Sequence, residues 1–217
     1  MSVNYQKILE KKIKEICKES KCRPRLLLHT CCAPCSSYCL EYLSDFFDIT
    51  VYYYNPNITE KNEYDMRVSE QKRLIEQLNA KIDESHKIHF IQGDYNPNVF
   101  FEKVKGYENC PEGGERCELC FRLRLEKSLE IAIEREIEYY TTSLTISPLK
   151  NAQLINQIGM ELADGKTTCF LNSDFKKNNG YKRSIELSKE YDLYRQDYCG
   201  CIYSKIEMEK RRNEKNN

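Results

Sequence analysis

Hydrophobic residues along the chain follow two kinds of pattern, short apolar runs and longer helical stripes. The runs predict strands at Leu26–Leu28, Ile49–Tyr54, Ile88–Ile91, Tyr139–Thr142 and Cys169–Leu171. The stripes predict helices at residues 5–19, 36–47, 60–81, 99–105, 117–136, 151–163 and 181–191. Strands that alternate with helices need right-handed crossovers, which favour a mostly parallel sheet. We therefore expect a single α/β domain over residues 1–217, with a Rossmann-like sheet flanked by helices. The polar residues from about 205 to 217 are expected to form a disordered tail.

The charge balance changes this picture little. The 34 basic and 34 acidic residues cancel, so any contact with nucleic acid depends on local patches. One such patch is Lys176, Lys177, Lys182 and Arg183. No apolar run approaches the roughly 20 residues that span a bilayer, and the first residues show no apolar signal region. We expect no membrane partner and a cytoplasmic location, where thiols stay reduced.

Twelve cysteines carry most of the candidate chemistry. Cys31 and Cys32 follow the first strand, and ligands of open parallel sheets bind beyond the carboxyl ends of the strands. Cys117 and Cys120 fall on the first turn of a helix, where the i and i+3 positions share one face. Four thiolates suit zinc or an iron–sulfur cluster. Adjacent cysteines are unusual in structural zinc sites, so the doublet favours a cluster or a two-metal arrangement, with a structural zinc site as the alternative.

Two further cysteine pairs suggest redox chemistry. Cys32 and Cys35 form a Cys-x-x-Cys pair, which also permits a thioredoxin-like function. Cys199 and Cys201 are separated by one glycine and can close only a very small disulfide ring. Strain in such a ring raises its reduction potential, which suits the exchange of two electrons. Additional metal ligands or free thiols are the alternatives for this last pair.

Several motifs, in order along most of the chain, resemble the cobalamin-independent epoxyqueuosine reductases of the QueH type, which act on transfer RNA. These motifs are His29–Cys35, Tyr54–Ile58, Glu63–Tyr64 with Arg67, Gly114–Phe121, Thr142–Lys150, Asp174–Lys177 with Gly180–Tyr181, and Tyr194–Cys201. Their number and order make the resemblance more specific than any single pair of cysteines.

The resemblance implies a metal centre and a reaction. It implies that a 4Fe-4S cluster is held by Cys31, Cys32, Cys117 and Cys120. It also implies a redox-active disulfide between Cys199 and Cys201, and it leaves His29 and Cys35 as candidates for a second metal, iron or zinc. The implied reaction removes the epoxide oxygen from epoxyqueuosine at the wobble position of the anticodon. The products are queuosine and water, and the electron donor is unidentified.

A bulky modified base must leave its stack to reach a buried centre, so aromatic platforms and amides are expected near the sheet edge. Tyr54, Asn55 and Asn57 follow the second strand and fit this need. The other polar residues of the motifs for which we expect substrate contacts are Arg67, Lys150, Asp174 and Lys177.

Three other functions compete with the reductase. A sulfur-inserting or adenylating enzyme needs a glycine-rich phosphate loop after the first strand, but this chain has a His-x-Cys-Cys sequence there and eight glycines in all. A zinc-stabilised RNA-binding module needs the four thiolates but not Cys199 and Cys201. A thiol–disulfide oxidoreductase needs only one Cys-x-x-Cys pair. The last two remain alternatives.

Overall fold

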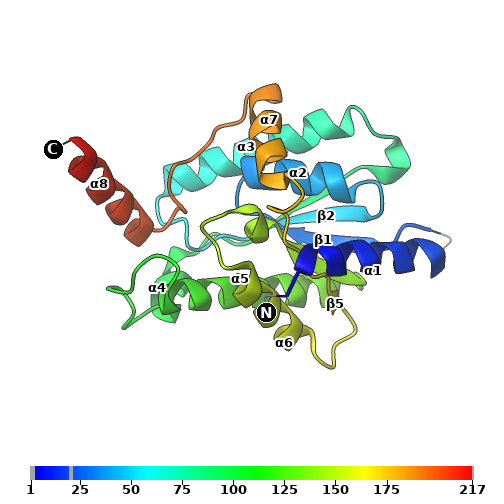
Figure 1. Ribbon diagram of the computed structural model, residues 1–217, viewed down its shortest axis with the longest axis horizontal. Coiled ribbons are helices and arrows are strands. Elements are labelled where there is room, and N and C mark those ends of the chain that lie inside the picture. Colours follow the sequence, from blue (N-terminus) through cyan, green and yellow to red (C-terminus); the bar gives the residue numbers. More distant parts are fainter. Residues whose placement is uncertain (1–2, 20–21, 217) are drawn as a thin grey trace.

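The computed structural model describes residues 3–19 and 22–216, and its strands form a five-stranded parallel sheet (Figure 1). The strands are β1 (Arg25–His29), β2 (Asp48–Tyr53), β3 (His89–Gln92), β4 (Tyr139–Thr142) and β5 (Cys169–Phe170). They lie in the order β3-β2-β1-β4-β5, and every neighbouring pair is parallel. The predicted parallel α/β fold is confirmed.

The helices lie close to the predicted stripes. They are α1 (Tyr5–Glu19), α2 (Ala33–Leu43), α3 (Lys61–Asn79), α4 (Pro97–Lys103), α5 (Glu115–Glu134), α6 (Ala152–Ala163), α7 (Gly180–Glu190) and α8 (Ile202–Asn216), with short 3-10 helices η1 (Glu84–His86) and η2 (Ser143–Ile146). Helix α2 begins earlier than predicted because Pro34 suits a first helical turn, where its missing N–H costs nothing. None of the helices within the described ranges has a stretch long and apolar enough to cross a membrane.

Helix α8 occupies residues for which the sequence pattern predicts a disordered tail; Asn217 lies outside the described residues. The first half of α8 is tied to the body of the protein. Lys205 Nζ lies 2.5 Å from Glu60 Oε1, and Glu207 accepts a bond of 3.1 Å from Arg116 Nη2. The helix then extends away from the sheet (Figure 1). Tyr203 also packs on Phe100 and under Arg116, but the rest of the helix is mostly charged, so it lacks the broad apolar stripe that would reveal it in the sequence.

The sheet is covered on both faces, and the alternation of side chains along each strand divides the core in two. Leu26 and Leu28 of β1 pack with α1, α2 and α3, whereas Leu27 faces α5 and α6. The division follows from the two-residue period of a strand. Figure 1 shows the resulting three layers, with α2 and α3 on one side and α5 and α6 on the other.

A close approach fixes α7 against α2. A Cβ atom at Gly180 would lie 2.0 Å from the carbonyl oxygen of Phe175 and 2.4 Å from the ring of Tyr38, so only glycine fits there. The contact fixes the start of α7, the helix that carries Tyr181 and Ser184.

The strand order reverses beside β1. The chain runs from β1 outward through β2 to β3, then returns to β4 on the opposite side of β1. The loops that leave β1 and β4 therefore diverge, and such a switch point forms a crevice at the carboxyl ends of the strands.

Candidate functional site

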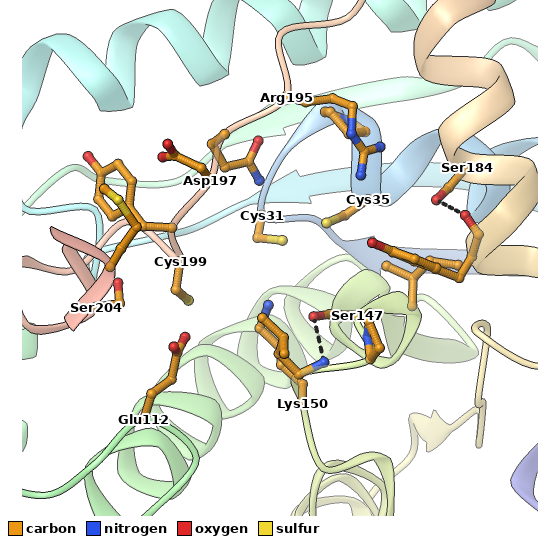
Figure 2. Close-up of a pocket in the computed structure, with 18 of the residues that line it drawn as sticks. Cys31, Cys35, Glu112, Ser147, Lys150, Ser184, Arg195, Asp197, Cys199 and Ser204 are labelled. Carbon is orange, nitrogen blue, oxygen red and sulfur yellow. Dashed lines mark hydrogen bonds between the residues drawn. The ribbon is translucent and has the colours of Figure 1, made fainter. Parts of the chain in front are cut away.

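A cavity of about 470 Å³ lies at this switch point. The loop after β1, the loop after η2, helix α7, the segment before α8 and α8 itself all contribute to its wall. Cys31, Cys35, Lys150, Tyr181, Gln196 and Cys199 are among its lining residues. In Figure 2, Cys31 and Cys35, from the turn between β1 and α2, and Cys199, from the segment before α8, lie around Lys150.

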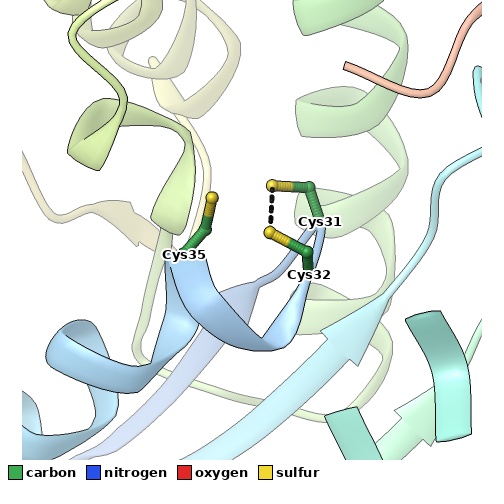
Figure 3. Close-up of side chains that lie close together, drawn as sticks. All are labelled: Cys31, Cys32 and Cys35. Carbon is green, nitrogen blue, oxygen red and sulfur yellow. Dashed lines mark hydrogen bonds between the residues drawn. The ribbon is translucent and has the colours of Figure 1, made fainter. Parts of the chain in front are cut away.

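Three thiols between the end of β1 and the first turn of α2 form a compact group (Figure 3). The Sγ atoms of Cys31, Cys32 and Cys35 all lie within 4.8 Å of one another, and those of Cys31 and Cys32 are 3.9 Å apart. Cys32 is the N-cap of α2, and Cys35 lies on its first turn. The partial positive charge at a helix N-terminus stabilises thiolates, so this position suits metal ligands.

The three thiols share their protons unequally. Hydrogen bonds with Cys32 and Cys35 hold the pKa of Cys31 well below the ordinary thiol value. Burial raises the pKa of Cys32 to about 12, and hydrogen bonding with Cys31 adds to this effect. The group therefore favours one thiolate, on Cys31, supported by two thiols. The charges of Lys150 and Arg124 also favour that thiolate.

Cys117 lies on the first turn of α5 and Cys120 on the second, because the helix begins at Glu115, two residues before the predicted start. The backbone N–H of Gly113 donates to Cys117 Sγ at 3.2 Å. Both cysteines line a small cavity of about 20 Å³ that they share with Cys199 and Cys201. Among the described residues, the compact group of Cys31 does not include this second pair. The predicted set of four ligands therefore stays a prediction.

Cys199 and Cys201 are free thiols in different surroundings. Cys199 is half-buried and lines both the large and the small cavity. Cys201 is buried and lines only the small one, where its sulfur is 3.4 Å from the backbone nitrogen of Ser204. The two thiols are consequently not equivalent, because only Cys199 faces the larger space.

A buried ion pair anchors the segment that carries these thiols. Arg67 Nη2 lies 2.7 Å from Glu63 Oε1, and the guanidinium is 1% exposed. The same guanidinium donates to the carbonyl oxygens of Cys199, at 3.1 Å, and Tyr198, at 3.3 Å. Gly200 follows with φ of +118°, a conformation that glycine adopts without strain. Arg67 thus fixes the backbone on which Cys199 is placed.

His29 is engaged at both ring nitrogens. Nδ1 lies 2.8 Å from Thr142 Oγ1, and Nε2 lies 3.0 Å from the carbonyl oxygen of Tyr54. Burial and the nearby charge of Arg124 lower the pKa of His29 to about 4. Neither nitrogen is free to bind a metal, which differs from the expectation that His29 helps to hold a second metal.

Tyr54, Asn55 and Asn57 follow β2 and are predicted to contact the substrate. The contacts described for Tyr54 and Asn55 are with other parts of the protein. Tyr54 stacks on Tyr52 with ring centroids 6.0 Å apart, and it is buried. Asn55 Nδ2 donates to the carbonyl oxygen of Thr30 at 2.8 Å, which joins the loops after β1 and β2. Asn57 lines the small cavity beside the cysteines.

The other predicted substrate contacts separate into three places. Lys150 lines the large cavity, and Arg67 lies beneath the Tyr198–Cys199 backbone. Asp174 and Lys177 line a neighbouring cavity of about 390 Å³, which shares Lys150 with the first. Of these residues, Lys150 is therefore the one placed beside the thiols.

Two residues near the thiols were missed by the sequence analysis as parts of the site. Gln196 Nε2 donates to Cys32 Sγ at 2.8 Å. Arg124 is completely buried and donates through Nε to the carbonyl oxygen of Cys120 at 3.0 Å. A signal existed for both, because Gln196 lies within the Tyr194–Cys201 motif and Arg124 is four residues after Cys120 on the same helical face.

Comparisons with known proteins agree on one family. A family model described as epoxyqueuosine reductase QueH matches residues 26–207. A protein of that name from Streptococcus pyogenes is 48% identical over 202 residues, which cover 93% of this chain and 78% of the relative. One from Staphylococcus epidermidis is 44% identical and covers 95% and 86%. One from Thermotoga maritima is 32% identical and covers 84% and 91%.

The anchor at Arg67 leads to a prediction. Replacing Arg67 with Met leaves Glu63 buried without its partner, so the free energy of unfolding is expected to fall by about 3–5 kcal/mol. The Tyr198–Cys201 segment also loses two hydrogen bonds and should be cleaved faster by proteases. Urea denaturation and limited proteolysis measure the two effects.

The matched control is Arg73→Met. Arg73 pairs with Glu70 on the same helix and also donates to the carbonyl oxygens of Tyr191 and Asp192, but it is partly exposed. A pair in contact with water contributes about 0–1 kcal/mol. Equal losses for the two variants would contradict the anchoring role.

Proposed function

The chain belongs to the epoxyqueuosine reductase QueH family, and we propose that it uses the thiols of this site to reduce epoxyqueuosine in transfer RNA. It is an oxidoreductase of queuosine biosynthesis. Cys31, Cys35, Cys199 and Lys150 line one cavity (Figure 2). This arrangement is the main support for assigning the cavity as the active site.

Cys199 and Cys201 are proposed to supply the two electrons. Both carbon–oxygen bonds of the epoxide break, a carbon–carbon double bond forms, and the oxygen leaves as water with the two thiol protons. The two sulfurs lose the electron pair and join as a disulfide. A reductant from outside the protein then restores the dithiol. The two thiols supply both the electrons and the protons of this step, so no other reductant takes part in it.

The two thiols are assigned different roles because of their exposure. Cys199 lines the large cavity and is the thiol that a substrate reaches. Cys201 is buried behind it and is the thiol that closes the disulfide.

Lys150 is proposed to stabilise negative charge in the cavity. Burial disfavours its charged form, yet the negative charges of Cys199 and Cys31 as thiolates raise the pKa of Lys150 above its ordinary value. The ammonium therefore stays charged while oxygen leaves carbon. A fixed cation beside a developing oxyanion stabilises that state more than the substrate.

The donor set fits a thiolate-held metal centre. Four cysteines line the small cavity, and the buried guanidinium of Arg124 supplies positive charge beside them. We assign Cys31, Cys32, Cys117 and Cys120 as the ligands of a 4Fe-4S cluster, and Cys35 as the remaining thiol for a second metal, iron or zinc. Such a cluster supplies one-electron transfer or Lewis-acid polarisation when bound.

The mouth of the large cavity is suited to RNA with one nucleotide turned out of its stack. Leu149 is 71% exposed and Tyr181 is 37% exposed beside it. Arg195, Arg211 and Arg212 line the same cavity and supply cations for the phosphates. A transfer RNA substrate also implies a cytoplasmic location for the enzyme.

The zinc-stabilised RNA-binding module and the thiol–disulfide oxidoreductase are less well supported. A binding module has no use for a thiol such as Cys199 that faces a cavity beside Lys150. A thiol–disulfide oxidoreductase needs no thiols on α5. Neither matches the family to which the chain belongs.

The function is tested with Cys199→Ser, Cys201→Ser and the double variant. Each is expected to keep its metal and bind transfer RNA but to lose turnover, because no intramolecular disulfide can form. Prereduced wild-type enzyme, freed of donor, should lose two thiols for each product formed. Cys169→Ser, at an exposed position, is the control. Turnover by the double variant at the wild-type rate would remove the proposed role of the pair.

The ligand set is tested with Cys117→Ala and Cys120→Ala. Loss of one thiolate from the helical turn should lower the iron and sulfide content to well under half of wild type, because thiolates hold the irons of such clusters. Cys39→Ala is the control, since Cys39 is a buried core residue. Iron and sulfide analysis after anaerobic purification gives the answer, and an unchanged content in both α5 variants would refute the assignment.

The RNA contact is tested with Leu149→Ala. If Leu149 fills the gap left by a displaced base, kcat/KM for transfer RNA should fall about tenfold, a cost of about 1.4 kcal/mol. Activity on the free epoxyqueuosine nucleoside should be unchanged, because it has no stack to leave. Met160→Ala is the control, an exposed apolar residue on α6. An equal loss on the nucleoside would place Leu149 in the reaction itself and contradict the RNA role.

A further inference from the structure

Arg124 carries a buried charge that protein groups satisfy only in part. The residue is 0% exposed, and its Nε donates to the carbonyl oxygen of Cys120 at 3.0 Å. Within residues 3–19 and 22–216, neither Nη1 nor Nη2 has a hydrogen-bond partner. Burial of a charge without a partner costs several kcal/mol. An anion close to the two terminal nitrogens would therefore stabilise this buried guanidinium.

The other two large buried arginines differ from Arg124. Arg67 is paired with the carboxylate of Glu63, and Arg116 is paired with the carboxylate of Glu207. Both also donate to backbone carbonyl oxygens. Arg124 forms no ion pair with a carboxylate among the described residues, so its charge is not used to hold two segments together.

Arg124 is surrounded in part by thiols and in part by the ring of Phe121, whose centroid lies 5.6 Å from the guanidinium carbon. It lines the small cavity with Cys117, Cys120, Cys199 and Cys201. Arg124 is thus placed beside the two assigned ligands of α5 and beside both thiols of the proposed dithiol.

We propose that Arg124 is the counter-cation of the thiolate-ligated centre, and that its charge raises the reduction potential of the cluster held there. This inference rests on the ligand set of the proposed function. A cluster held by four thiolates is anionic when oxidised and gains one more negative charge on reduction. A nearby cation in a poorly solvated site stabilises the more negative state more strongly. Arg124 accordingly acts as a positioning residue, through charge and not through contact with substrate.

The test compares Arg124→Met, which removes the charge, with Arg124→Lys, which keeps it. After anaerobic reconstitution, the midpoint potential of the cluster is measured by a redox titration followed by electron paramagnetic resonance. The Met variant should be at least tenfold harder to reduce, a shift of about 59 mV to more negative potential for one electron. The Lys variant should lie closer to wild type.

Arg122→Met is the matched control. Arg122 is on the same helix, is partly exposed and pairs with Glu161 Oε2 at 2.8 Å. Its charge is screened by water and by that partner, so the midpoint potential should not change. An equal shift in this variant would mean that the overall charge of α5, and not Arg124, sets the potential.

A second readout separates charge from packing. Without metal, the Met variant should be at least as stable to urea as wild type, because an unpaired buried charge has been removed. Wild type should gain more stability than the Met variant when the cluster is incorporated. A residue needed only for packing would instead destabilise both forms equally and leave the potential unchanged.

The outcomes distinguish the two proposals. A wild-type protein that holds no iron and sulfide after reconstitution overturns the cluster assignment and this inference with it. A Met variant with a full cluster and an unshifted potential overturns the inference alone. If the Met variant holds no cluster, the urea comparison decides, and a metal-free Met variant less stable than metal-free wild type would overturn the inference.

Discussion

The geometry of the site depends on the imidazole of His29, buried at the end of β1. Its Nε2 lies against the carbonyl oxygen of Tyr54 and must donate to it, so Nδ1 accepts from the hydroxyl of Thr142. A neutral ring satisfies both bonds, which agrees with a pKa lowered to about 4. His29 thereby joins the ends of β1, β2 and β4 at the point where the strand order reverses. The loops that carry Cys31 and Lys150 both start from this fixed junction.

Buried arginines then bring distant segments to the junction. The sequence has no net charge, but Arg67, Arg116 and Arg124 place three cations in the interior. Two of them link distant segments. Arg67 holds the segment before α8 by donating to the carbonyl oxygen of Tyr198, and Arg116 holds α8 itself through Glu207. The third faces thiols. Arg67 and Arg116 attach segments through carbonyl and carboxylate partners, whereas Arg124 keeps both terminal nitrogens without a partner among the described residues.

The sequence predicts the sheet well because its strands are buried on both faces and read as apolar runs, as at Leu26–Leu28. It also identifies the chemistry of the site, since cysteine pairs are rare enough to stand out. It does not predict the roles of Arg67 and Arg124, because a charged residue in a helical pattern usually faces water and only tertiary contacts reveal that it is buried. Helix α8 escapes prediction for a related reason: ion pairs to Glu60 and Arg116 hold it, and ion pairs leave no hydrophobic period.

The proposed ligand thiols and the proposed electron-carrying thiols are held by different kinds of backbone. Cys32 and Cys117 lie at the starts of helices α2 and α5, which pack on the sheet and keep their positions. Cys199 lies in an irregular segment, and the next residue is Gly200 with φ of +118°. Gly200 is the one residue between the two sulfurs of the proposed disulfide, and glycine has the widest range of conformations for closing so small a ring. Metal ligands need fixed positions, whereas a dithiol that opens and closes needs freedom at the residue between its sulfurs. In the proposed site, Cys31 and Cys32 lie just before α2, Cys117 and Cys120 lie in the first two turns of α5, and the dithiol lies in the irregular segment before α8.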